Sequence, residues 1–250
     1  MGSRLMKLLG CILVILWYTV MIRKNGWSVW EAKGETMFHY EYVTRKEAEP
    51  YRKEFQEIIH EVQDLLRDKF TFSYQFIGSS SRDMITYDPT TNKGFDFDVN
   101  LEVNDEDEIF TAEEIKKNIM SAINQVAWRK GFRSCEDSTR VITLKKTNLL
   151  PFPRVEYSCD FAIVHSYVDR KGQKHQQYIH FQKNQGTYQW REQQKGYDLD
   201  SRVEWLRKQG LWNDVRDLYL WKKNNNADLK KKSRSLYAET INEVYRNNAN

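Results

Sequence analysis

The segment Phe95-Asp96-Phe97-Asp98-Val99-Asn100-Leu101-Glu102 decides the fold, because apolar and polar residues alternate along it without a break. Alternation with a period of two is typical of a β-strand, in which successive side chains point to opposite faces. The strand therefore buries its aromatic and aliphatic face and presents Asp96 and Asp98 on the other face. Strand rise places these two residues about 7 Å apart at the backbone. Their carboxylate oxygens can therefore converge on one divalent cation.

A third acidic residue lies in a second apolar segment further along the chain. Asp160 interrupts the strand-like run from Val155 to Val164. A charge among apolar residues costs free energy unless it is paired or bound to a metal ion. If this strand neighbours the first one, Asp96, Asp98 and Asp160 can together hold two Mg²⁺ or Mn²⁺ ions about 3.5–4 Å apart, an arrangement that serves in-line phosphoryl displacement. The alternatives are an exposed strand face for the first two residues and a capping or salt-bridged role for Asp160.

A turn rich in glycine and serine precedes both acidic segments. The strand predicted over Phe72–Ile77 ends at Gly78-Ser79-Ser80-Ser81. Gly78 allows the backbone to approach an anion closely. Backbone N–H groups and the hydroxyls of Ser79 and Ser80 can donate hydrogen bonds to phosphate oxygens, and Arg82 can add a charge-assisted contact. Taken alone, the same residues are also typical of an ordinary loop.

The remaining pattern predicts an α+β fold. The expected elements are an amphipathic helix over Glu47–Phe70, a helix opened by a capping box at Thr111–Glu114 and ending near Lys130, a hairpin joining Met84–Tyr87 to Gly94–Val103, strands at Arg140–Lys146, Arg154–Tyr167 and Gln177–Lys183, and helices after Asp198. A mixed sheet with flanking helices is therefore expected, followed by a helical C-terminal lobe. The predicted divisions are residues 1–36 as an apolar segment and connector, 37–185 as the catalytic domain and 186–250 as the helical lobe.

The order of these parts resembles the polymerase-beta-type nucleotidyltransferase superfamily. That pattern, hG[GS] then [DE]h[DE]h then h[DE]h, reads here as Ile77-Gly78-Ser79, Phe95-Asp96-Phe97-Asp98-Val99 and Cys159-Asp160-Phe161. Arg82 matches the arginine of the GSxxR form, and the resemblance covers roughly residues 45–165. The helical C-terminal part is similar to that of the longer members, which include oligoadenylate synthases, cyclic-dinucleotide synthases and poly(A) polymerases. The interval from Ser79 to Asp96 is longer than in the compact members, which leaves the subfamily open.

The resemblance implies an enzyme that moves a nucleoside monophosphate from a nucleoside triphosphate to a hydroxyl and releases pyrophosphate. It assigns two Mg²⁺ or Mn²⁺ ions and the catalytic role to Asp96, Asp98 and Asp160, and the nucleotide to Gly78, Ser79, Ser80 and Arg82. The acceptor stays open between RNA, a nucleotide, a protein and a small molecule. Two other functions fit the sequence: a non-catalytic nucleotide- or RNA-binding module of the same fold, and a membrane-tethered interaction protein.

Charge and cysteine content limit the partners and the compartment. The net charge of +4 permits a polyanionic substrate without requiring one. The basic run from Lys222 to Arg234 is either a solvated helix face or a contact for phosphates or a polyanionic acceptor. Three cysteines with wide spacing and no CxxC argue against a disulfide framework or a zinc site. A reducing compartment, the cytoplasm, is therefore expected.

The N-terminus carries an apolar run of its own. Residues 8–22 contain no charged side chain and are flanked by basic residues on both sides. The run is shorter than the ~20 residues of a usual spanning helix. Three interpretations fit: an uncleaved membrane anchor, a signal peptide, or an upstream extension with Met37 as the alternative start. We therefore expect membrane contact, where it occurs, to be made through residues 8–22.

Overall fold

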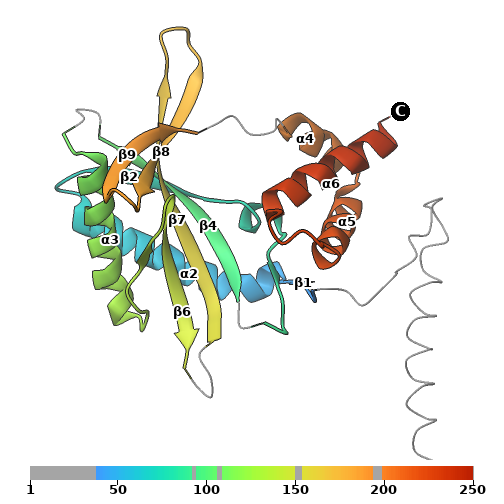
Figure 1. The fold of residues 1–250 in the computed structure, drawn as a ribbon, viewed down its shortest axis with the longest axis horizontal. Helices are drawn as coiled ribbons and strands as arrows, with labels where there is room; N and C mark the ends of the chain where they lie inside the picture. The colour runs from blue at the N-terminus through green and yellow to red at the C-terminus, as the bar shows by residue number, and fades with distance from the viewer. Residues whose placement is uncertain (1–37, 92–93, 106–108, 150–153, 194–198, 250) are drawn as a thin grey trace, which may run out of the picture. The chain divides into compact units, whose positions relative to one another are not determined.

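Seven strands form one mixed sheet in the part of the chain that the computed structural model describes, which comprises residues 38–91, 94–105, 109–149, 154–193 and 199–249 (Figure 1). The central strand order is β2-β4-β7-β6-β5, and β8 pairs with β7 and β9. The strands are β2 (Thr71–Ile77), β4 (Phe95–Asn104), β5 (Glu136–Asp137), β6 (Val141–Asn148), β7 (Arg154–Val168), β8 (Lys174–Gln182) and β9 (Thr187–Glu192). Only β4 and β7 pair in parallel within these ranges, and the other pairs are antiparallel.

Helices α2 (Arg45–Leu66) and α3 (Ala112–Arg129) cover one face of this sheet (Figure 1). Both begin with a capping box, in which Thr44 pairs with Glu47 and Thr111 pairs with Glu114. The box satisfies backbone donors that the first helical turn leaves free, which fixes where each helix starts. Their apolar stripes pack on the alternating buried positions of β4 and β7 in one core, with Phe55, Ile58, Val62, Ile119, Ile123, Val99 and Phe161 among its members. The two predicted helices are confirmed.

The C-terminal part is helical and has its own core. It consists of α4 (Asp200–Lys208), α5 (Trp212–Asn224) and α6 (Ser233–Asn248). Its buried apolar residues are Leu206, Val215, Tyr219, Leu236, Tyr237, Ile241 and Val244. Met84, from the segment that follows β2 and its turn, packs in this second core and so joins it to the sheet. The predicted α+β architecture with a helical C-terminal part is confirmed.

The predicted hairpin between Met84–Tyr87 and Gly94–Val103 is wrong. The short strand β3 (Thr86–Tyr87) pairs instead with β1 (Glu41–Tyr42). The reason is that a strand has two hydrogen-bonding edges, and both edges of β4 are occupied, one by β2 and the other by β7. The sheet also continues beyond residue 185, the expected end of the catalytic domain, because β9 pairs with β8.

The N-terminal residues 1–37 lie outside the described residues, and the apolar run at 8–22 is among them. Residues 37–250 form one compact unit. None of the helices described in that unit combines the length and the apolar character needed to cross a bilayer.

Candidate functional site

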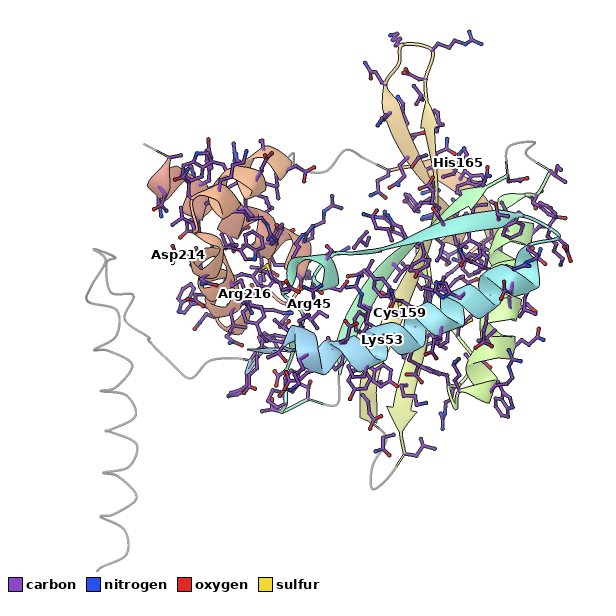
Figure 2. All side chains as sticks on the ribbon, turned by 180° about the vertical axis from the view of Figure 1, so that it is seen from behind. Arg45, Lys53, Cys159, His165, Asp214 and Arg216 are labelled. Atoms are coloured by element: carbon purple, nitrogen blue, oxygen red, sulfur yellow. The ribbon has the colours of Figure 1, made fainter. Side chains whose placement is uncertain are left out.

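The parallel pairing of β4 with β7 brings the three predicted carboxylates together. Asp98 lies directly opposite Asp160 in the register, and Asp96 lies opposite Ser158. The intervening residues of both strands, among them Phe97 and Cys159, are buried on the helix-covered face, where Figure 2 shows Cys159 behind α2. Because side chains alternate along a strand, the three aspartates share the face that α2 and α3 leave uncovered. The predicted adjacency of Asp160 to the D-x-D strand is confirmed.

Hydroxyl groups hold two of these carboxylates in place. Thr143 Oγ1 on β6 donates to Asp160 Oδ1 at 2.6 Å. Ser158 Oγ donates to Asp96 Oδ1. Within the described ranges no basic side chain forms an ion pair with Asp96, Asp98 or Asp160. The salt-bridged role considered for Asp160 therefore has no support among these residues.

The electrostatics of the three carboxylates favour a bound cation. Burial, followed by the charges of Asp160 and Asp96, raises the pKa of Asp98 to about 6, although Arg82 opposes the shift. Burial also raises the pKa of Asp160, against the hydrogen bond from Thr143. Like charges this close repel one another, and a cation between them removes the repulsion. The oxygen-only donor set is the one that hard divalent ions such as Mg²⁺ prefer.

The carboxylate oxygens are of the type that a metal ion prefers, but they are not arranged to bind one in this structure. In the described residues no group of three or more His, Cys, Asp or Glu side chains is placed to hold a metal ion as it stands. The hydroxyls of Thr143 and Ser158 donate to one oxygen each of Asp160 and Asp96, and a metal ion would use these oxygens as ligands. The donors therefore fit a divalent ion by type and position in the sheet, and side-chain rotation would have to complete the ligand set.

Gly78 is required where it stands, because its backbone packs against the carboxylate of Asp98. Its φ of +67° is strained for any other residue, and a Cβ there would stand 2.4 Å from Asp98 Oδ2. The chain then enters a short 3₁₀ turn, η1 (Ser80–Arg82). Ser80 Oγ donates to the carbonyl of Ile77 at 2.9 Å and is buried. In this structure the Ser80 hydroxyl stabilises the turn itself, so its contact with a phosphate stays a prediction.

Arg82 extends from the turn toward the helical part. Its guanidinium carbon lies 4.2 Å from the centre of the Tyr237 ring on α6. Its charge opposes the rise in the pKa of Asp98 and the rise in the pKa of Tyr219 on α5. Arg82 therefore carries a positive charge close to both the carboxylates and two tyrosines of the helical core, Tyr219 and Tyr237.

Lys223 on α5 brings a second positive charge to the site from the other part of the chain. Its Nζ donates to Thr86 Oγ1 at 2.5 Å and lies 4.2 Å from the centre of the Tyr40 ring. Burial lowers the pKa of Lys223 to about 8, although the charge of Asp96 opposes the shift. The sequence indicated a basic run that starts at Lys222 but could not single out Lys223, because only the folded chain brings α5 to β3. Lys222 itself pairs with Glu243 at 2.7 Å.

No protein-family model matches the chain, and no curated protein matches its sequence. Solved structures do match. The STING-associated CdnE c-di-GMP synthase from Capnocytophaga granulosa superposes with a TM-score of 0.53 at 16% identity, over 83% of this chain and 64% of that one. The CdnE cyclic dinucleotide synthase from Elizabethkingia meningoseptica, with GTP and Apcpp, gives 0.46 at 14% identity over 76% and 69%. The Vibrio cholerae cyclic AMP-GMP synthase DncV, with a linear intermediate, gives 0.49 at 14% identity over 77% and 53%.

The class of fold is therefore the nucleotidyltransferase fold, as the sequence motifs indicated. Within that class, the matched structures named above are cyclic-dinucleotide synthases. This chain spans 64% of the Capnocytophaga protein and 53% of the Vibrio protein. The likeness to these structures concerns the fold alone.

Proposed function

We propose that this protein is a metal-dependent nucleotidyltransferase, which moves a nucleoside monophosphate from a nucleoside triphosphate to a hydroxyl acceptor and releases pyrophosphate. The observation that carries the proposal is the pairing of Asp98 with Asp160 on adjacent parallel strands, with Gly78 packed against the Asp98 carboxylate. A turn that permits close backbone approach and a group of carboxylates are the two parts that triphosphate chemistry needs.

The carboxylates would bind two Mg²⁺ or Mn²⁺ ions. Asp96 and Asp98 would each contact both ions, and Asp160 would contact one of them. When bound, such ions neutralise charge on the triphosphate and on the leaving pyrophosphate. Asp160 also faces the acceptor. Asp160 would help to activate the incoming hydroxyl through the ion that it holds.

The triphosphate would be held by the turn and by two positively charged side chains, those of Arg82 and Lys223. The backbone at Gly78 and the groups of Ser79 and Ser80 would donate to its oxygens, and Arg82 would add a charge-assisted contact. Lys223 would contribute a charge from α5. The acceptor oxygen then forms a bond to the α-phosphorus, the bond from that phosphorus to the bridging oxygen breaks, and pyrophosphate leaves with the electron pair.

The matched Capnocytophaga structure, a c-di-GMP synthase, supports a nucleotide as the class of substrate. The acceptor hydroxyl would belong to a second nucleotide, RNA, a protein or a small molecule. We place the reaction in the cytoplasm, where nucleoside triphosphates are available. If residues 8–22 contact a membrane, they would anchor the enzyme on that side.

The test is to incubate the protein with each labelled nucleoside triphosphate and Mg²⁺ or Mn²⁺, and to measure pyrophosphate and products. We expect transfer that stops when EDTA is added, and that falls by more than about 100-fold in Asp98→Asn because phosphoryl transfer depends on positioning and charge neutralisation. Asp83→Asn is the matched control, since Asp83 is an exposed carboxylate near the same turn with a φ of +56° that asparagine tolerates. Absence of transfer with every nucleotide would leave the non-catalytic binding module as the better interpretation.

A further inference from the structure

The uncovered face of the sheet continues from the carboxylates to a basic and aromatic surface on β8 and β9. Val164 lies four residues after Asp160 on β7 and therefore on the same face. Tyr178 of β8 pairs with Val164, and Arg191 of β9 pairs with Tyr178. Directly paired residues of neighbouring strands share a face. Arg140, Tyr178, His180 and Arg191, which we call the Arg140 surface, therefore lie on the face that carries Asp160.

Arg140 is held in place within this surface. Its guanidinium carbon lies 4.0 Å from the centre of the Tyr178 ring. Its Nη2 donates to Gln193 Oε1 at 2.9 Å. A guanidinium fixed on an aromatic ring keeps its charge and loses little further freedom when it meets a ligand.

The positive charges of this surface are not neutralised by neighbouring acids. In the ranges that the structure describes, no carboxylate lies within ion-pair distance of Arg140 or Arg191. His180 Nδ1 is buried without a hydrogen-bond partner among the same residues. Burial lowers the pKa of His180, and the charges of Arg191, Lys116 and Arg140 add to the shift. The surface thus concentrates uncompensated positive charge beside an aromatic ring, which suits a polyanion with planar groups.

We propose that the Arg140 surface binds the upstream part of a single-stranded oligonucleotide whose terminal hydroxyl is the acceptor at Asp160. This inference rests on the proposed function, because it names the class of its acceptor. The residues Arg140 and Arg191 would contact backbone phosphates, and the Arg140–Tyr178 pair would offer a stacking platform for a base.

The spacing sets the length of acceptor that can use this surface. Four residues along β7 and one step to β8 separate Asp160 from Tyr178, which is about 14 Å by strand rise and strand spacing. Stacked nucleotides advance about 3.4 Å each along a strand. An acceptor of roughly four or more nucleotides would span the distance, whereas a mononucleotide at Asp160 would not reach Arg140.

The experiment measures binding without NTP or metal, so that it does not depend on turnover. Two fluorescein-labelled single-stranded RNA probes, of about two and about eight nucleotides, are titrated with the full chain, and DNA probes of the same sequence show whether the sugar matters. The test variant is Arg140→Gln/Arg191→Gln. The control is Arg170→Gln/Lys171→Gln, which removes two exposed charges from the turn between β7 and β8. Thermal unfolding of both variants checks that each is folded.

We expect the long probe to bind the test variant roughly tenfold more weakly than the parent, with a slope of log affinity against log salt that is smaller by about 1.4. The control variant should bind the long probe like the parent, and the short probe should not distinguish the three proteins. Equal affinity of parent and test variant for the long probe would overturn the proposal, and so would failure of the parent to bind it. Transfer to mononucleotides without long-probe binding would overturn the proposed role of the Arg140 surface and leave the proposed transferase activity intact. Long-probe binding through Arg140 and Arg191 without any transfer would overturn the proposed transferase activity and leave the binding role of the surface.

Discussion

Asp98 is half-buried among other acidic side chains, so its charge opposes folding when no cation is bound. Its pKa of about 6 in the folded chain exceeds the ordinary value of 3.8. A raised carboxyl pKa contributes stability below the unfolded pKa, and this stability is lost as pH rises through 6. Asp98→Asn removes the charge, so we expect the metal-free protein to gain about 1–2 kcal/mol at neutral pH, after allowance for solvent screening.

Urea unfolding in EDTA checks this at neutral pH and at about pH 3, where we expect most of the gain to disappear because the parent carboxyl is then largely protonated in both states. Asp160→Asn should be nearly neutral in the same assay, since asparagine can still accept from Thr143 Oγ1. A large loss of stability confined to Asp160→Asn would contradict a shared cation site and indicate a structural role for that residue.

Asp88, which lies outside the site, has a lowered pKa, in contrast to the raised pKa of Asp98. It is 3% exposed and accepts hydrogen bonds from Thr90 N at 2.9 Å, Thr90 Oγ1 at 2.6 Å and His39 N at 3.1 Å. Burial acts to raise its pKa, but these hydrogen bonds together leave the pKa below the ordinary value. A lowered pKa contributes stability above the unfolded pKa, and this stability is lost as pH falls through the folded pKa.

Asp88→Asn should therefore lower the free energy of unfolding by about 1–3 kcal/mol at neutral pH, because hydrogen bonds to a charged acceptor are replaced by weaker ones. The difference from the parent should shrink as pH falls below about 4. Urea unfolding across that range measures both effects. A difference that stays constant with pH would show that the charge of Asp88 is not what matters.

At the scale of single elements, the approach of β4 to β7 depends on Gly94. A Cβ at this position would stand 1.9 Å from the carbonyl oxygen of Glu156, a backbone atom that cannot move aside alone. We expect Gly94→Ala to lower the free energy of unfolding by more than about 3 kcal/mol, since the start of the parallel pair must separate.

Gly186→Ala is the control for Gly94→Ala. Gly186 has a φ of +65° and open space around the added atom, so only backbone strain of about 1 kcal/mol is expected. Thermal unfolding compares the two. Equal losses would mean that the contact with Glu156 is relieved elsewhere and that β4 and β7 tolerate a wider separation.

The sequence predicted the elements that have a strong period and failed where pairing is decided over long distances. The unbroken alternation of Phe95–Glu102 and the apolar run around Asp160 predicted two strands that carry the carboxylates, and the order of the motifs, through its resemblance to a known superfamily, suggested that these strands are neighbours. The turn chemistry between Tyr87 and Gly94 suggested a hairpin, but the local signal cannot show that β4 already has β2 and β7 as partners. The strand β9 was missed for a similar reason, since it exists as a strand through its pairing with β8.

Lys223 shows the same limit within the site. Nothing in the local sequence distinguishes Lys223 from Lys222 beside it. In the folded chain Lys222 forms an ion pair with Glu243, whereas Lys223 donates to Thr86 and its pKa is affected by the charge of Asp96. Which of two neighbouring lysines faces the carboxylates depends on how α5 packs against β1 and β3. That packing is a property of the whole folded chain.

At the scale of the whole molecule, the residues just after Met37 join the sheet to the helical part. The backbone N–H of Tyr40 donates to Asn224 Oδ1 at 2.6 Å, and Asn224 Nδ2 donates to the Tyr40 carbonyl at 3.1 Å. Tyr42 OH donates to the carbonyl of Arg216 on α5 at 2.7 Å. The guanidinium carbon of Arg216 lies 4.5 Å from the centre of the Tyr42 ring. The described chain is therefore anchored from about residue 39 onward.

Residues 1–36 are predicted to be dispensable for the fold of the rest. Residues 37–250 form a compact unit by themselves. Near the start of the described chain, His39 N donates to Asp88 and Tyr40 N donates to Asn224. A chain that begins at Met37 should therefore unfold cooperatively, with a midpoint within about 2 °C of the full chain.

A chain that begins at Thr44 is the control, because it keeps the cap of α2 but lacks β1, the Tyr40–Asn224 pair and the bond from Tyr42 to Arg216. Loss of these hydrogen bonds, each worth about 1 kcal/mol, should lower its midpoint by roughly 5–10 °C, given about 2–4 °C per kcal/mol for a chain of this size. Loss of cooperative unfolding in the chain that begins at Met37 would show that the N-terminal segment takes part in the fold, whereas an unchanged midpoint in the chain that begins at Thr44 would show that β1 does not hold the sheet and the helices together.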